Sequence, residues 1–198
     1  RGSGDVPTLT IEEYRALPLR QRVAYRLMRH PLVLLGFGPF YLFVLKYRVP
    51  GGLMRAGPGP WISTMGTNLA LVGLVVLAGT TLGWMNLLII QLPVTLLAGG
   101  AGIWLFYIQH QFEDVYWARD PEWNFHSGAL QGSTHYVLPG PLRWLTANIG
   151  IHHVHHLASK IPFYRLDTVL DDHPELHAFC RLGLRESIAC FRLALIDE

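Results

Sequence analysis

Charged side chains are scarce in this sequence of 198 residues. Only 15% of the residues are charged and 51% are hydrophobic, whereas a soluble globular chain carries about 25% charged residues. The net charge is only +2, so binding to nucleic acid has no electrostatic support. The composition favours a membrane protein and argues against a nucleic-acid partner.

Cysteine is also scarce, and the chain starts without methionine. Cys180 and Cys190 lie ten residues apart in a stretch with helical spacing of apolar residues. On a helix they are about 15 Å apart along the axis, which is too far for a disulfide. We therefore expect two free thiols in a reducing compartment. The chain opens at Arg1 with no signal-peptide pattern, and we expect its amino-terminal portion to be missing.

The longest charge-free stretch covers residues 56–112, which contain no Asp, Glu, Lys or Arg. As helix, these 57 residues extend for about 86 Å, enough to cross a hydrocarbon core of about 30 Å twice. Residues 83–86, Gly-Trp-Met-Asn, offer a natural turn. We predict a transmembrane helical hairpin with spans near residues 66–82 and 87–108.

The basic residues predict the orientation of this hairpin. Nine of the 16 Lys and Arg residues precede the charge-free stretch and seven follow it, while the turn carries none. By the positive-inside rule, both ends of the hairpin are cytoplasmic. We therefore predict that residues 109–198 form a cytoplasmic helical cap, with the bacterial inner membrane as the expected location.

Two further segments precede the hairpin. Thr10 and Glu13 fit a capping box, and a helix rich in arginine is expected over residues 10–29. It is read either as a solvated helix or, as we favour, as an interfacial helix on an anionic membrane surface. Residues 31–47 are apolar but short, and are interrupted by Gly and Pro, so we predict a re-entrant or interfacial segment. In the cap, apolar residues spaced from Leu176 to Leu195 predict a last helix that begins near Pro174.

Four of the ten histidines lie within residues 152–156, in the run His-His-Val-His-His. On a helix, His152, His155 and His156 share one face and can point at a common metal pair, while His153 lies at its edge. Neutral imidazole is a ligand for Zn, Cu, Fe and Ni. Core packing gives no reason for four histidines in five residues, so this run is our main candidate metal site.

His110 is a second candidate, because it lies just beyond the second predicted span. Ionisable residues at the membrane surface are often functional, but an ordinary interfacial histidine is an equal alternative. Glu113 and Asp114 are candidates for orienting ligand imidazoles, or for ordinary surface acids. The remaining histidines are weaker candidates. His173 and His177 have the spacing of a metal pair on a helix, but a solvated helix start is the simpler reading.

These residues carry a resemblance to a known family. The run from His152 to His156 resembles the last histidine box, H-x-x-H-H, of membrane fatty acid desaturases. Residues 107–117, Tyr-Ile-Gln-His-Gln-Phe-Glu-Asp-Val-Tyr-Trp, and residues 148–152, Asn-Ile-Gly-Ile-His, are similar to bacterial acyl-lipid desaturases of the omega-6 (delta-12) type. The resemblance extends over nearly the whole chain and implies an all-α membrane protein with a single desaturase domain over residues 1–198.

The resemblance implies a non-haem di-iron centre that uses O₂ and two electrons to place a double bond in an acyl chain. His152, His155 and His156 are implied as iron ligands, and so is His110; His153 occupies an x position and is the weakest candidate. No catalytic residue is expected beyond the metal ligands. The implied partners are an acyl lipid or acyl thioester and an electron donor such as ferredoxin or a cytochrome. Double-bond position, chain length and oligomeric state are not encoded in recognisable form.

The sequence also departs from the family pattern. The two earlier boxes, H-x-x-x-H and a further H-x-x-H-H, do not occur in these 198 residues, so we expect an amino-terminally truncated desaturase that is inactive alone. Two alternatives stay open. One is another histidine-box oxygenase, such as a carotenoid hydroxylase or ketolase or an alkane hydroxylase. The other is a non-catalytic metal-binding membrane protein.

Overall fold

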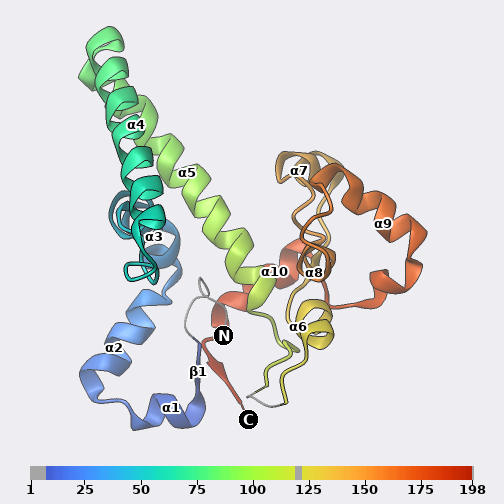
Figure 1. Ribbon diagram of the computed structural model, residues 1–198. Coiled ribbons are helices and arrows are strands. Elements are labelled where there is room, and N and C mark those ends of the chain that lie inside the picture. The colour runs from blue at the N-terminus through green and yellow to red at the C-terminus, as the bar shows by residue number, and fades with distance from the viewer. Residues whose placement is uncertain (1–7, 119–121, 198) are drawn as a thin grey trace. The chain divides into compact units, whose positions relative to one another are not determined.

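The computed structural model describes residues 8–118 and 122–197, which divide into two compact units (Figure 1). Among the described residues, the first unit covers residues 20–104 and the second covers residues 8–19 and 105–197. Helices dominate both units, and the strands are only two residues long. With two helices apolar enough to span a membrane, the protein is an all-α membrane protein, as the sequence predicts.

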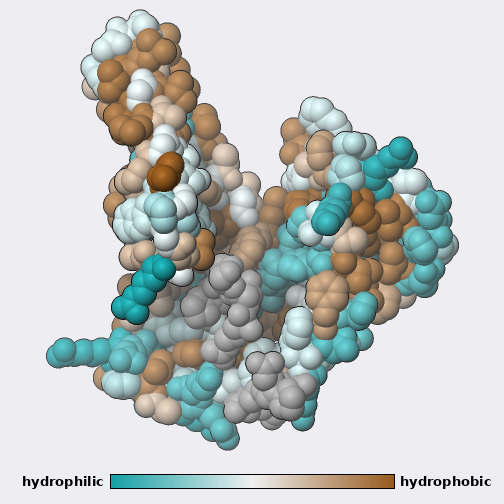
Figure 2. Space-filling view, viewed as in Figure 1, coloured by the Kyte–Doolittle hydropathy of each residue, from teal (hydrophilic) through white to brown (hydrophobic). Residues whose placement is uncertain are grey.

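Two long helices, α4 (Pro58–Leu82) and α5 (Trp84–His110), make up most of the first unit. They have 25 and 27 residues, and both are long and apolar enough to cross a membrane. Most of their large apolar side chains are exposed, and Figure 2 shows apolar surface on α4. Side chains that are apolar all round and unburied by protein are typical of helices that face lipid.

The two helices meet at a turn of one residue, Gly83, whose φ is +89°. The turn is tighter than the one predicted over residues 83–86, because the ring of Trp84 packs directly on Gly79. A Cβ atom at Gly79 would lie 2.5 Å from this ring. Helix α4 also begins well before residue 66, since Pro58 and Pro60 lie in its first turn, where proline costs no hydrogen bond.

The segment before α4 is a chain of short helices: α2 (Leu19–Met28), η1 (Val33–Phe37), α3 (Gly38–Phe40), η2 (Tyr41–Leu45) and η3 (Lys46–Arg48). The chain bends by 67° between α2 and the helices that start at Val33, and by length and composition alone the pair fits a broken span or a re-entrant loop. It packs on α5 where small residues allow close approach. A Cβ atom at Gly99 would lie 2.6 Å from the Pro39 ring.

The second unit combines short helices with two pairs of parallel strands. Strand β1 (Leu9–Thr10) pairs with β4 (Leu195–Ile196), and β2 (His135–Tyr136) pairs with β3 (Arg181–Leu182). The helices are α1 (Ile11–Ala16), α6 (Phe125–Gln131), α7 (Gly140–Leu145), α8 (His152–Leu157), η4 (Phe163–Arg165), α9 (Leu166–Asp172), η5 (Pro174–Ala178), α10 (Leu184–Ala189) and η6 (Cys190–Arg192). The last two turns of α5 also belong to this unit.

A small apolar core lies behind α8. Ile151 and Val154 are almost fully buried and pack with Leu166, Leu170 and Leu176. Ile151 directly precedes α8, Val154 lies within it, and the other three side chains come from α9 and η5. The core therefore fixes one side of α8, and the other side is left for the site.

The structure corrects two predicted helices. The capping box is confirmed, since Glu13 N donates to the Thr10 side chain and the Glu13 carboxylate accepts from Thr10 N. The helix nevertheless ends at Ala16 instead of continuing to residue 29. Leu17 has an extended ψ of 145°, because the residue before a proline avoids the helical region. A second helix, α2, starts after Pro18.

The predicted last helix from Pro174 to Leu195 is wrong. That stretch holds η5, β3, α10, η6 and β4 instead. Cys180 has a positive φ of 36°, which interrupts a helix, and residues 181 and 182 then pair with β2. The prediction of free thiols is confirmed for both cysteines, although they do not share the helix on which that prediction was based.

Candidate metal centre

Helix α8 starts at the first histidine of the run because β2 holds the residues before it. Tyr136 N donates to Gly150 O at 2.7 Å, and His152 N donates to Thr134 O at 3.2 Å. Gly150 lies so close to this segment that a Cβ atom would be 2.4 Å from Tyr136 O. A larger residue at this position would therefore push α8 away from β2.

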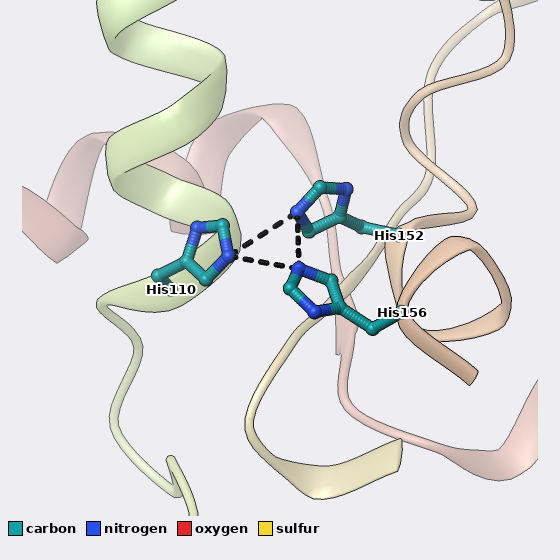
Figure 3. Close-up of side chains that lie close together, drawn as sticks. All are labelled: His110, His152 and His156. Carbon is teal, nitrogen blue, oxygen red and sulfur yellow. Dashed lines mark hydrogen bonds between the residues drawn. The ribbon is translucent and has the colours of Figure 1, made fainter. Parts of the chain in front are cut away.

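Three histidines from two helices converge at one point (Figure 3). His110 lies at the end of α5, and His152 and His156 lie one turn apart on α8. The Nε2 atoms are 3.1 Å apart for His110 and His156, 3.3 Å for His110 and His152, and 3.0 Å for His152 and His156. Among the described residues, this is the group of metal-ligating side chains that could hold an ion. We call it the histidine triad.

One metal ion would satisfy the three facing nitrogens of the triad more fully than hydrogen bonds among them can. Each imidazole nitrogen has one in-plane orbital, which holds either a proton or a lone pair. Three nitrogens that all touch one another cannot make three hydrogen bonds from three such orbitals. One ion satisfies all of them, since neighbouring ligand atoms at about 2.1 Å from a metal are about 3.0–3.4 Å apart in octahedral or tetrahedral geometry.

The proton of His110 is held on the ring nitrogen that faces away from the triad. Nδ1 of His110 lies 2.8 Å from Phe106 O, and a carbonyl oxygen only accepts, so Nδ1 carries the proton. In the neutral tautomer that this bond selects, the ring presents a bare Nε2 lone pair to the triad. A bond from the other ring nitrogen to a carbonyl is the usual way in which a metal-binding histidine is oriented.

His152 is held in the neutral form that a metal ligand needs. Burial is the main cause that lowers its pKa, to about 2, and the neighbouring imidazoles of His110, His156, His155 and His153 lower it further. Metal binding competes with protons for the imidazole lone pair. A buried neutral imidazole is therefore prepared to bind a cation, and iron is among the metals that this donor type suits.

His153 faces the opposite side of α8 and does not contribute to the triad. Its side chain is fully buried, and its Nε2 donates to Leu176 O at 3.0 Å. Burial lowers its pKa although two backbone hydrogen bonds oppose the shift. His153 therefore links α8 to η5 within the core, whereas the sequence placed it at the edge of the metal-facing side.

His155 lies beside the triad but outside it. Its ring stacks on His152 with 5.5 Å between centroids and 24° between the planes. The sequence placed His152, His155 and His156 on one face of a helix. In the six-residue helix α8, only His152 and His156, which are four residues apart, join the triad.

The other histidines lie elsewhere. The ring centroid of His135 is 5.4 Å from that of His153 and 5.8 Å from that of His177. His173 instead contacts the Glu175 carboxylate at 3.1 Å, so it is not brought into contact with His177 as a pair. His30 and His126 are exposed.

Glu113 and Asp114 are exposed in the turn after α5. Neither makes a hydrogen bond to a triad histidine within the described residues, and the orienting role at His110 is filled by Phe106 O. Their charges instead act on the cysteines. Burial raises the pKa of both thiols, and Asp114 adds to the shift at Cys180, as Glu113 and Glu186 do at Cys190.

Sequence reasoning missed one polar residue at the site, Gln109. It precedes His110 and is almost completely buried, although a glutamine is usually exposed. The only signal was its place in the run of residues 107–117 that resembles desaturases. Burial of the amide could not be read from that run.

Fold and site together define a helical membrane protein with three histidines, placed where they could hold a metal ion, at the end of a helix apolar enough to span a membrane. The chain belongs to the fatty acid desaturase family, whose profile, described as "Fatty acid desaturase", matches residues 2–184. A curated relative from Bacillus subtilis (strain 168), "Fatty acid desaturase", is 40% identical over 198 residues, which are 100% of this chain and 56% of the relative. The chain thus spans little more than half the length of that relative. No solved structure matches it significantly.

Proposed function

We propose that the chain forms part of an O₂-dependent fatty acid desaturase, and that its histidine triad holds one iron ion of a di-iron centre. The observation that carries the proposal is the convergence of three Nε2 atoms within 3.3 Å of one another, in a chain of the desaturase family. When bound, the iron would supply the oxidising power to remove two hydrogens from an acyl –CH₂–CH₂– unit, and these two hydrogens, O₂, two electrons and two protons would together give two waters.

The chain's own residues hold and orient the site in this proposal. His110, His152 and His156 offer neutral lone pairs, and Phe106 O keeps the proton of His110 on the far nitrogen. His153 fixes α8 to the core from behind. His155 lies outside the triad, and we propose it as a ligand of the second iron that the family resemblance implies. Any further ligands would come from outside the triad.

We further propose that the site faces the cytoplasm and that α2 lies along the membrane surface. Nine basic residues precede the charge-free stretch and seven follow it, and by the positive-inside rule this distribution supports a cytoplasmic location of both flanks. Leu19, Val23 and Leu27 recur every fourth residue on α2 and are 58–74% exposed, and Arg20 and Arg26 are also exposed. An apolar face beside arginines suits an anionic lipid surface. The acyl substrate enters from that membrane, and an electron donor, a ferredoxin or a cytochrome, delivers electrons from the cytoplasm.

The test is to express the complete reading frame that encodes this chain in a host without desaturases and to analyse the cellular fatty acids. A new double bond that disappears in the His152→Ala variant supports the proposal. Products that gain oxygen would identify a histidine-box hydroxylase or ketolase instead. Unchanged fatty acids together with histidine-dependent metal binding would favour the non-catalytic metal-binding protein.

A further inference from the structure

The end of α5 and the start of α8 are joined by a buried amide. Gln109, next to His110 in the chain, is 1% exposed. Its side-chain Nε2 donates to Ile149 O at 3.0 Å, across 40 residues of sequence. Ile149 lies three residues before His152. The contact therefore connects the two backbone segments from which the triad is built.

The backbone of Gln109 makes a second connection between the same segments. Gln109 O accepts from Thr134 N at 3.1 Å, and Thr134 O accepts from His152 N at 3.2 Å. The three hydrogen bonds form a closed path from α5 to the segment before β2, on to α8, and back through Ile149. A path closed in this way leaves little freedom in the separation of His110 and His152.

The turn that carries Ile149 cannot easily adjust if this contact is lost. Ala147 and Asn148 have positive φ values of 51° and 54°, which non-glycine residues rarely adopt. Gly150, on the other side of Ile149, lies so close to Tyr136 O that even a Cβ atom at this position would clash with it. Because its neighbours are already constrained, the carbonyl of Ile149 has a fixed direction, and Gln109 supplies a donor that meets it.

We propose that Gln109 is a positioning residue of the metal centre, which holds the His110 end of α5 at the distance from α8 that three Nε2 ligands require. The inference rests on the proposed metal-binding role of the triad. Ligands must be held to within about 0.5 Å for productive binding. The side chain of Gln109 does not touch the metal site itself and acts on it through the Ile149 carbonyl.

A matched pair of variants tests this role in the full chain, with Co²⁺ as the probe. Gln109→Met keeps the length of the side chain and deletes the donor. Gln111→Met makes the same change two residues away. Gln111 Nε2 donates to Thr8 Oγ1 at 2.7 Å and to the backbone oxygen of His110 at 3.3 Å, so this control deletes an amide beside His110 that does not reach the segment before α8. We measure Co²⁺ affinity, the visible spectrum of the bound ion, and thermal unfolding of the metal-free protein.

We expect Gln109→Met to weaken Co²⁺ binding by about 10- to 100-fold and to alter the visible spectrum, while Gln111→Met changes neither. The two variants should unfold at similar temperatures without metal, which separates positioning from a general loss of stability. If Gln109→Met does not fold, Gln109→Asn, which retains the amide but shortens its reach by one methylene, carries the same test. Wild-type affinity and spectrum in the Gln109 variant would overturn the inference alone. Absence of histidine-dependent Co²⁺ binding in the wild type would overturn both this inference and the proposed function.

Discussion

The two sides of helix α8 use the same residue type for opposite purposes. On one side, His152 and His156 converge with His110 at distances of 3.0–3.3 Å between nitrogens. On the other, His153 is fully buried beside Val154 and donates to a backbone carbonyl. One histidine-rich motif therefore contains both candidate ligands and a structural anchor. Substitutions on the two sides should therefore have different effects.

The largest expected effect is a loss of metal binding when a histidine on the triad side of α8 is replaced. In His152→Ala, the triad loses the buried member that contacts both partners, so we expect Co²⁺ affinity to fall by more than about 100-fold. Isothermal titration of the detergent-solubilised chain measures it. His173→Ala, at an exposed histidine bonded to Glu175, is the control and should bind as the wild type does. Wild-type Co²⁺ affinity in His152→Ala would contradict the assignment of metal binding to this side of α8.

The core-facing side of α8, which carries His153, should instead affect the stability of the fold. His153→Ala removes a buried hydrogen bond and leaves Leu176 O unsatisfied, together with a cavity in the core. We expect a loss of about 2–4 kcal/mol in the free energy of unfolding of the metal-free protein, measured by denaturant titration. His152→Ala is the matched control and should lose less. Equal losses in the two variants would contradict the division between the sides.

The buried histidine beside the anchor predicts how stability depends on pH. Burial lowers the pKa of His135 to about 4, and His153, Arg181, His177 and Arg143 lower it further. Between pH 6.5 and 4 the unfolded chain takes up a proton that the folded chain does not, so stability falls as the pH falls, by about 1.4 kcal/mol per unit for this group. His135→Phe should show a shallower loss over that range. An unchanged slope in His135→Phe would show that His135 is not the group responsible.

The smallest effect is expected at His155, which stacks on the triad without joining it. In His155→Ala, the three Nε2 atoms keep their contacts, so Co²⁺ affinity should fall by well under the tenfold typical of residues that support a metal ligand. The titration used for His152→Ala measures it. A loss as large as that of His152→Ala would place His155 in the same ligand set and redefine the metal-facing side of α8.

The sequence was informative where the signal was local. The box of residues 152–156 and His110 were recognised because the residue type itself is unusual there. The capping box at Thr10 was predictable from the three-residue spacing to Glu13. The two apolar helices were predictable from the long charge-free stretch. The break at Leu17 follows from Pro18 by a local rule that the prediction did not apply.

Features that depend on distant contacts could not be predicted. The stretch after Pro174 has the apolar spacing of a helix, but residues 181–182 pair with β2, 46 residues earlier. The division between His153 and the triad depends on which side of α8 meets Leu176 and which meets His110. Helical spacing alone gives the angles between these side chains, and not the partners that surround them.

The most direct test of the central claim is X-ray absorption at the iron edge of the chain loaded with Fe²⁺ under anaerobic conditions. The account predicts imidazole scattering from three histidines at one ion, reduced in each of His110→Ala, His152→Ala and His156→Ala and unchanged in His173→Ala. A spectrum without imidazole scattering, or one that stays the same when the triad histidines are replaced, would contradict the claim that these three residues form the metal site.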